Sequence, residues 1–288
     1  MNILSIHSSV ALGYVGNSGI GFVLRRLGHE VWPINTVVFS NHPAHGGFRG
    51  RVTPAAEIAE LVRGLGERGA LARCDAVLSG YLGAPEQGPA VLDTVSAVRQ
   101  ANPGTLWLLD PVIGDGTGAA ARAYVKPGIA EWLRDRAAPE ADILTPNAYE
   151  LGVLAGRAVD TTATALDAME AVRARSRRST CTVIATGLAL GDAPPETLTS
   201  LAVDGRGAWR VGVPRVQHAA HGAGDIFAAV LLGRMLSGDA LPQALAGASG
   251  CLSGIIARTD AGAADLAIVA AQDEIAAPRQ LPPVEVLR

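Results

Sequence analysis

The segment His221-Gly222-Ala223-Gly224-Asp225-Ile226-Phe227 leads into the apolar run Ala-Ala-Val-Leu-Leu-Gly-Arg-Met-Leu236. Small residues at 222–224 let the backbone turn sharply and bring its N–H groups close to a ligand, and the apolar run predicts a buried helix. Free N–H groups and the positive end of the helix dipole would then converge on residues 222–225, which suits an anion. We therefore interpret Gly222, Ala223 and Gly224 as a candidate anion hole.

Asp225 follows this turn directly and is the candidate catalytic base. A carboxylate there can accept the proton of a substrate hydroxyl while neighbouring N–H groups hold a transferring phosphate, as a kinase requires. A structural alternative stands beside this hypothesis, because Asp is common at helix N-termini and glycine supplies 34 of the 288 residues. The motif alone leaves both interpretations open.

Composition narrows the possible classes of protein. Charged residues make up 18% of the chain and the formal net charge is −3, so no basic patch favours a nucleic-acid partner. No apolar run approaches the roughly 20 residues of a membrane span, and Met1 leads into a strand-like segment without a signal-peptide pattern. We therefore predict a cytoplasmic protein.

The three cysteines are Cys74, Cys181 and Cys251, an odd and widely scattered set. They form no C-x-x-C pair and have no histidine at metal-ligand spacing. We expect reduced, mostly buried thiols that act as small apolar side chains.

Short apolar runs alternate with amphipathic segments along the whole chain. This order predicts an α/β fold with a mostly parallel sheet covered by helices on both faces, in one domain over residues 1–288. The Pro-rich end from residue 277 is expected to be a surface tail. Strands are predicted at residues 3–7, 30–38, 76–79, 106–110, 143–145, 182–186 and 198–203. Further helices are predicted at residues 16–27, 53–69, 86–102, 126–136, 148–156, 164–175 and 241–259.

Polar residues that end these strands are candidates for ligand binding, because open α/β sheets bind ligands beyond the carboxyl ends of their strands. Ser8 follows the first strand and leads through a Gly-rich turn into a helix. Tyr81 follows the third predicted strand, where its ring could cover a flat substrate. An ordinary Ser cap and a half-buried Tyr are the structural alternatives.

Two acidic clusters also follow strands. Asp110 ends an apolar strand, and Pro111 keeps it from entering a helix directly, so its carboxylate suits a Mg²⁺ ion that bridges phosphates. Thr145, Asn147 and Glu150 follow another strand, and residues three apart share one face of a first helical turn. Placement in a first turn is also favoured by the helix dipole, which is the structural alternative for Glu150.

Together these motifs resemble the pyridoxal kinases of the ribokinase-like superfamily, and the resemblance to the bacterial branch runs from end to end. Its most specific parts are Ser40-Asn41-His42 and Ser79-Gly80-Tyr81-Leu82-Gly83. The resemblance implies a three-layer α/β/α fold, a homodimer, and Mg²⁺- and ATP-dependent phosphorylation of the 5′-hydroxymethyl group of pyridoxal. The segments that carry it are Ser8 and residues 13–17, 31–42, 74–83, 110–114, 145–150, 222–225 and 270–278.

The same resemblance implies a role for individual residues. Asp225 would be the base and residues 222–224 the anion hole. Asp110 and Glu150 would bind the metal, Glu150 through water. The expected substrate-binding residues are Ser8, Val15, Pro43, Ala44, Tyr81 and Asp225. The expected ATP-binding residues are Asp110, Thr145, Glu150, Thr186, Val213, Pro214, Arg215 and Val216.

The chain departs from its relatives in the loop over residues 41–51, which is expected to act as an active-site flap. Relatives usually continue Ser-Asn-His with Thr and, two residues later, Tyr, whereas this chain has Pro43, Ala44 and His45. His45 could replace the lost aromatic contact, although a solvated loop histidine is the favoured interpretation. His7 and Ser9 also replace the Gln and His that flank Ser8 in relatives.

The changed flap keeps two further functions open. One is a hydroxymethylpyrimidine kinase or another small-alcohol kinase of the same fold. The other is a non-catalytic protein that binds B6 vitamers, which a retained base at Asp225 argues against.

Overall fold

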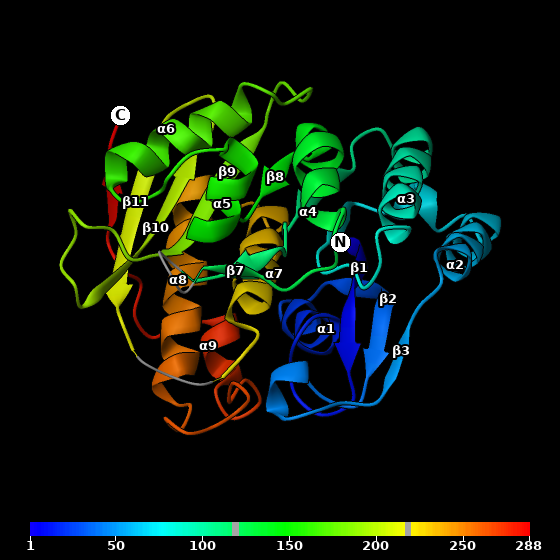
Figure 1. The fold of residues 1–288 in the computed structure, drawn as a ribbon, viewed down its shortest axis with the longest axis horizontal. Helices are drawn as coiled ribbons and strands as arrows, with labels where there is room; N and C mark the ends of the chain where they lie inside the picture. Colours follow the sequence, from blue (N-terminus) through cyan, green and yellow to red (C-terminus); the bar gives the residue numbers. More distant parts are fainter. Residues whose placement is uncertain (117–120, 217–219) are drawn as a thin grey trace.

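The computed structural model describes residues 1–116, 121–216 and 220–288, which contain a ten-stranded sheet in the order β12-β11-β10-β9-β8-β5-β4-β1-β2-β3. The strands from β2 to β9 in this order pair in parallel, which confirms the mostly parallel α/β sheet. β3 lies at one end of the sheet and the C-terminus beside β11 at the other (Figure 1). The parallel strands are β1 (Asn2–Val10), β2 (Glu30–Phe39), β4 (Ala76–Ser79), β5 (Leu106–Leu109), β8 (Ile143–Leu144) and β9 (Thr182–Leu188). The antiparallel strands are β3 (Gly50–Val52), β10 (Thr197–Val203), β11 (Ala208–Pro214) and β12 (Val284–Val286).

Helices cover both faces of this sheet, as the three-layer α/β/α prediction requires. Alternate side chains of one strand enter different cores: Trp107 and Leu109 pack on one side, and Leu108 packs on the other. The core that contains Leu108 is closed by α1 (Asn17–Arg26), α7 (Ala223–Leu236), α8 (Leu241–Ala257) and α9 (Gln272–Ala276). The core that contains Trp107 is closed by α2 (Ala55–Glu67), α3 (Gln87–Ala101), α4 (Ile129–Trp132), α5 (Ala148–Ala155) and α6 (Thr162–Arg173).

The structure corrects two of the predicted elements. The predicted surface tail contains β12, which pairs with β11 and extends the sheet, although its side chains remain largely exposed. The helix predicted over residues 126–136 begins later, because α4 starts at Ile129, and it changes to a π-helical segment over Leu133–Ala137. β3, β11 and a small hairpin of β6 (Gly114–Asp115) and β7 (Arg122–Ala123) were not predicted.

The structure also bears on the predictions about a membrane span and about the three cysteines. Within the described ranges, no helix combines the length and the apolar character needed to cross a bilayer. Cys74, Cys181 and Cys251 are all free thiols and all buried, which confirms their predicted role as small core residues.

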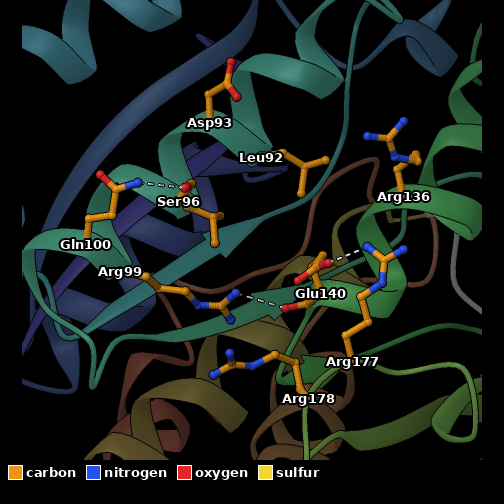
Figure 2. Close-up of a pocket in the computed structure, with 10 residues that line it drawn as sticks. Leu92, Asp93, Ser96, Arg99, Gln100, Arg136, Glu140, Arg177 and Arg178 are labelled. Carbon is orange, nitrogen blue, oxygen red and sulfur yellow. Dashed lines mark hydrogen bonds and ion pairs between the residues drawn. The ribbon is translucent and has the colours of Figure 1, made fainter.

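An arginine-rich cavity of about 520 Å³ lies where the parallel strands begin, at the edge of the sheet opposite the predicted site. In Figure 2, Arg99 and Arg177 both donate hydrogen bonds to Glu140. Arg99 donates to its backbone carbonyl oxygen and Arg177 to its side-chain carboxylate. Beside the cavity, the buried carboxylate of Asp142 accepts hydrogen bonds from Arg99 at 2.6 Å, Arg178 at 2.8 Å and the Trp107 backbone N–H at 2.8 Å. The bond from Trp107 joins the start of β5 to the start of β8, and the two ion pairs connect this point to α3 and to the segment before β9, so we assign Asp142 a structural role.

We expect Asp142→Asn to lower the free energy of unfolding by on the order of 3 kcal/mol, because it leaves a largely buried Arg99 without its counter-charge. Urea unfolding at neutral pH measures this change. Asp135→Asn is the matched control, because its pair with Arg134 is solvent-exposed and should add nothing measurable. Equal stability of both variants would contradict the structural role of Asp142.

Candidate active site

Asp225 lies in the first turn of α7 and is held from the other end of the chain. The backbone N–H of Gly16 donates to its Oδ2 at 2.6 Å, and Nε2 of His7 lies 3.3 Å from its Oδ1. Its side chain keeps 12% of its surface exposed, so it stays accessible to a small substrate. The structure thus joins the end of β1, the start of α1 and the start of α7 at one carboxylate.

The turn before α7, which is predicted to form an anion hole, depends on a glycine conformation. Gly222 adopts φ 94°, a left-handed conformation that favours glycine, and α7 begins at the next residue. A Cβ at Gly222 would lie 2.9 Å from the Tyr14 carbonyl oxygen. At Gly224, by contrast, no described atom lies within 4 Å of the place that a Cβ would take. A helix leaves its first N–H groups without intrahelical partners, and the open space beside Gly224 leaves room for an anion at this end of α7.

His7 supports Asp225 as a neutral imidazole. Burial lowers the pKa of His7, and the Asp225 carboxylate only partly opposes this effect. Its Nδ1 accepts the Ser8 backbone N–H at 2.9 Å, so the proton of the neutral ring resides on Nε2 and points to Asp225. The Tyr81 N–H also lies 3.4 Å from Nε2, a separation too long to decide the tautomer.

Asp110 and Glu150 form a buried acidic pair beside Asp225. Burial, and next the charge of Asp225, raise the pKa of Asp110 to about 8, although the Thr145 hydroxyl donates to it at 3.2 Å. Burial and then Asp110 raise the pKa of Glu150. One oxygen each of Asp110 and Asp225 lies within 4.8 Å of the other and of a His7 nitrogen. The three carboxylates therefore repel one another unless a proton or a cation intervenes.

Glu150 also has a structural function, which is the alternative suggested by its place in the first turn of α5. Its Oε1 accepts the Ile113 N–H at 3.0 Å and its Oε2 accepts the Asn147 N–H at 2.9 Å. Asn147 in turn caps α5 by accepting the Glu150 N–H, which completes a capping box. Both oxygens are thus engaged by the backbone, which fits an indirect rather than a direct contact with a metal.

The remaining predicted residues surround this centre in two groups. Ser8 is half-buried beside Gly16, Val15 is buried, and Tyr81 is half-buried with its pKa raised by burial. Pro43 and Ala44 are exposed in a short 3-10 turn, Pro43–His45. On the nucleotide side, Thr145 lies next to Asp110, and Thr186 pairs with Asn147 across neighbouring strand ends. Val213 and Pro214 end β11, and Arg215 and Val216 continue from it along the exposed surface.

The structure also gathers histidines that the sequence did not connect. The rings of His42 and His221 stack with centroids 4.1 Å apart, and His45 lies 5.6 Å and 5.7 Å from them. The favoured interpretation of His45 as a solvated loop residue is wrong, because its Nε2 is buried. Burial, together with the neighbouring His221 and His45, lowers the pKa of His42 to about 4. A separation of 176 residues hid His45 from His221 in the sequence, so only the fold could reveal this cluster.

A three-layer α/β/α fold that carries a carboxylate beside a helix-start anion hole is that of the ribokinase-like kinases. Comparison with known proteins agrees and is more specific. The family model described as phosphomethylpyrimidine kinase matches residues 71–266. A pyridoxal kinase PdxY of Rubrobacter xylanophilus is 46% identical over 96% of this chain and 94% of its own length. A PdxY of Granulibacter bethesdensis is 43% identical over 96% of this chain and 97% of its own length.

Solved structures give the same result. The pyridoxal kinase of Leishmania donovani in complex with ADP matches with a TM-score of 0.91 at 28% identity, over 100% of this chain and 99% of that one. The chain therefore belongs to the pyridoxal kinase family, and the sequence resemblance is confirmed.

We expect His7→Leu to lower kcat by about 10- to 100-fold, because Asp225 loses the N–H group that fixes its position. His7→Gln keeps a hydrogen-bond donor there and should retain most of the activity. The KM for ATP should not change in either variant. Steady-state assays of the three proteins measure both quantities. A Gln variant as impaired as the Leu variant would show that His7 acts through packing alone.

We expect Asp110→Asn to raise the melting temperature of the ligand-free protein at pH 8, and the gain should vanish near pH 4. The pKa of Asp110 is about 8 in the folded protein against an ordinary 3.8, so the unfolded chain releases this proton earlier as pH rises. The free energy of unfolding of the wild type therefore falls as the pH rises from the ordinary pKa of 3.8 to the raised pKa of about 8. The variant has no carboxyl group at this position to titrate, so it avoids that loss. Calorimetry at several pH values, with exposed Asp93→Asn as the control, measures the difference. An equal gain at every pH would contradict it.

Proposed function

We propose that this protein transfers the γ-phosphoryl group of ATP to the 5′-hydroxymethyl group of pyridoxal. The observation that carries the proposal is the Asp225 carboxylate, fixed by the Gly16 N–H at the first turn of α7. The substrate oxygen forms a bond to the γ-phosphorus while the bond from that phosphorus to the β,γ-bridging oxygen breaks. Asp225 takes the hydroxyl proton, and ADP leaves.

The chain's own residues position these groups. The Gly16 N–H and the neutral His7 ring orient Asp225 from two sides, so that a lone pair of its carboxylate can face the hydroxyl. N–H groups at residues 222–224 stabilise the negative charge that the phosphoryl oxygens carry during transfer. Because these groups are fixed before substrate arrives, little reorganisation is needed during the reaction.

Mg²⁺ fits the acidic side of this site. Asp110, Glu150 and Asp225 repel one another, and a divalent cation relieves that repulsion better than protons do at neutral pH. We assign Asp110 to the ion and Glu150 to a contact through water, because both oxygens of Glu150 already accept backbone N–H groups. When bound, the ion would offset negative charge on the phosphates of ATP.

The substrate and nucleotide contacts follow from the same arrangement. Ser8, Val15 and Tyr81 would hold the pyridine ring, and Pro43 and Ala44 would cover it from the flap loop, residues 41–51. Thr145 and Thr186 would face the phosphates, and residues 213–216 the adenine. We further propose that residues 1–288 act as one domain, that the protein is a cytoplasmic homodimer, and that the flap loop orders over bound substrate.

Phosphorylation of a hydroxymethylpyrimidine is the second candidate function. It is favoured by the match to the phosphomethylpyrimidine kinase model. A Bacteroides thetaiotaomicron protein described as a candidate phosphomethylpyrimidine kinase, crystallised with pyridoxal, also matches with a TM-score of 0.87 at 25% identity. Pyridoxal remains the better candidate, because PdxY relatives share far more identity with this chain. A purely binding protein would have no use for the anchored base.

An ATP-consumption screen over pyridoxal, pyridoxine, pyridoxamine and the aminopyrimidine alcohol tests the proposal. We expect the highest kcat/KM with pyridoxal. Asp225→Asn should lower kcat by about 10²- to 10⁴-fold with little change in ATP affinity, because it removes the proton acceptor alone. Asp260→Asn, on the exposed surface, is the control. Preference for the pyrimidine would refute the substrate, and normal turnover in Asp225→Asn would refute the mechanism.

A further inference from the structure

Three histidines meet beside the anion hole, and we call His42, His45 and His221 the histidine trio. His42 caps the 3-10 turn of the flap loop and His45 is the last residue of that turn, whereas His221 directly precedes Gly222. The trio therefore connects the most exposed loop near the site to the turn that opens α7. None of the three is needed for the proposed phosphoryl transfer.

The ring nitrogens of the trio have the spacing of potential metal ligands. One nitrogen from each ring lies within 4.8 Å of the other two. Nitrogens bound to one tetrahedral Zn²⁺ ion, at about 2.0–2.1 Å from it, lie about 3.3 Å apart. The stacked rings of His42 and His221, 23° from parallel, would have to turn until their lone pairs converge. Rotation about side-chain torsions suffices, because all three residues are only half-buried.

Two unsatisfied polar atoms beside the trio favour a cation. Nε2 of His45 is buried and has no hydrogen-bond partner among the described residues. Oδ1 of Asp265 is likewise buried without a partner in that part of the chain. Asp265 pairs with His221 as an isolated bridge, so its negative charge lies next to the trio. A buried nitrogen and a buried carboxylate oxygen without partners are unfavourable unless a ligand satisfies them.

We propose that the histidine trio is a second metal site, which takes a divalent transition-metal ion, with Zn²⁺ as the best fit. Three imidazoles suit Zn²⁺ and leave its fourth position open for water, whereas Mg²⁺ prefers the oxygen ligands around Asp110. The two ions would therefore not compete for one set of ligands. His45 is the residue that completes the trio.

Metal at this site would tie the flap loop to the anion hole. His42 and His45 would move with the loop, while His221 is fixed by its N–H bond to the Ala264 carbonyl oxygen at 3.3 Å. Hydrogen bonds such as those from Asn41 Nδ2 to the Gly47 carbonyl oxygen at 2.7 Å and from the Arg49 N–H to Ser40 Oγ at 2.9 Å close the loop on itself rather than onto α7. If the proposed function holds, bound Zn²⁺ would slow the exchange of substrate and product. The metal site itself does not depend on that function.

Titration of the full chain with Co²⁺ in the presence of excess Mg²⁺ tests the site without any turnover assay. We expect one Co²⁺ per chain, with the intense visible absorption of a tetrahedral ion, and displacement by Zn²⁺. His45→Asn and His221→Asn should each weaken binding by more than about 10-fold, because each removes a ligand. Arg49→Asn, an exposed change in the same loop, is the matched control and should bind like wild type.

Hydrogen exchange provides a second test, and its deciding comparison, wild type with and without Zn²⁺, needs no variant. Zn²⁺ should increase protection of residues 41–51 in wild type and leave it unchanged in the His45→Asn protein. Absence of saturable Co²⁺ binding to wild type would overturn the site, as would equal binding in all variants, which would place the ion elsewhere. Unchanged protection of the loop in zinc-bound wild type would overturn the tether.

Discussion

The hydrogen bond from the Gly16 N–H to Asp225 is the contact on which the site depends. It spans 209 residues and links the start of α1 to the first turn of α7. Because Gly16 follows directly on the turn after β1, the bond fixes the base relative to the strand ends. The anion hole and His7 take their positions from the same junction, and Asp110 lies beside it. Any change that shifts α1 against α7 therefore alters several functional groups at once.

The two edges of the parallel sheet differ in function: the edge where the strands end carries the candidate active site, and the edge where they begin stabilises the fold. Residues that follow the parallel strands, such as Asp110 and Glu150, hold unfavourable charge close together. Residues that precede those strands, such as Asp142, pair with arginine and stabilise the fold. The fold tolerates this repulsion because ion pairs at the opposite edge and an apolar core on each face of the sheet stabilise the strands. A cation that binds at the acidic edge therefore relieves a repulsion that is already present in the ligand-free protein.

Local sequence predicted much of this arrangement, and the limits have physical causes. β4 and β5 are continuous apolar runs, so their assignment needed no tertiary information. β12 is a short, exposed segment that becomes a strand only because β11 offers an open edge, which its own residues do not reveal. Glu150 could be placed beside the site from its spacing, but not its two bonds to backbone N–H groups. The approach of His7 to Asp225 was equally hidden, because a neutral buried histidine leaves no pattern in sequence.

The final strand has a consequence for how the protein can be handled. The Ala208 N–H donates to the carbonyl oxygen of Arg288, and the Leu287 N–H donates to the carbonyl oxygen of Ala208. Residues 284–288 thus shield an edge that would otherwise present unpaired backbone groups to other molecules. Trimming a few residues would expose β11 to pairing with another chain and promote aggregation.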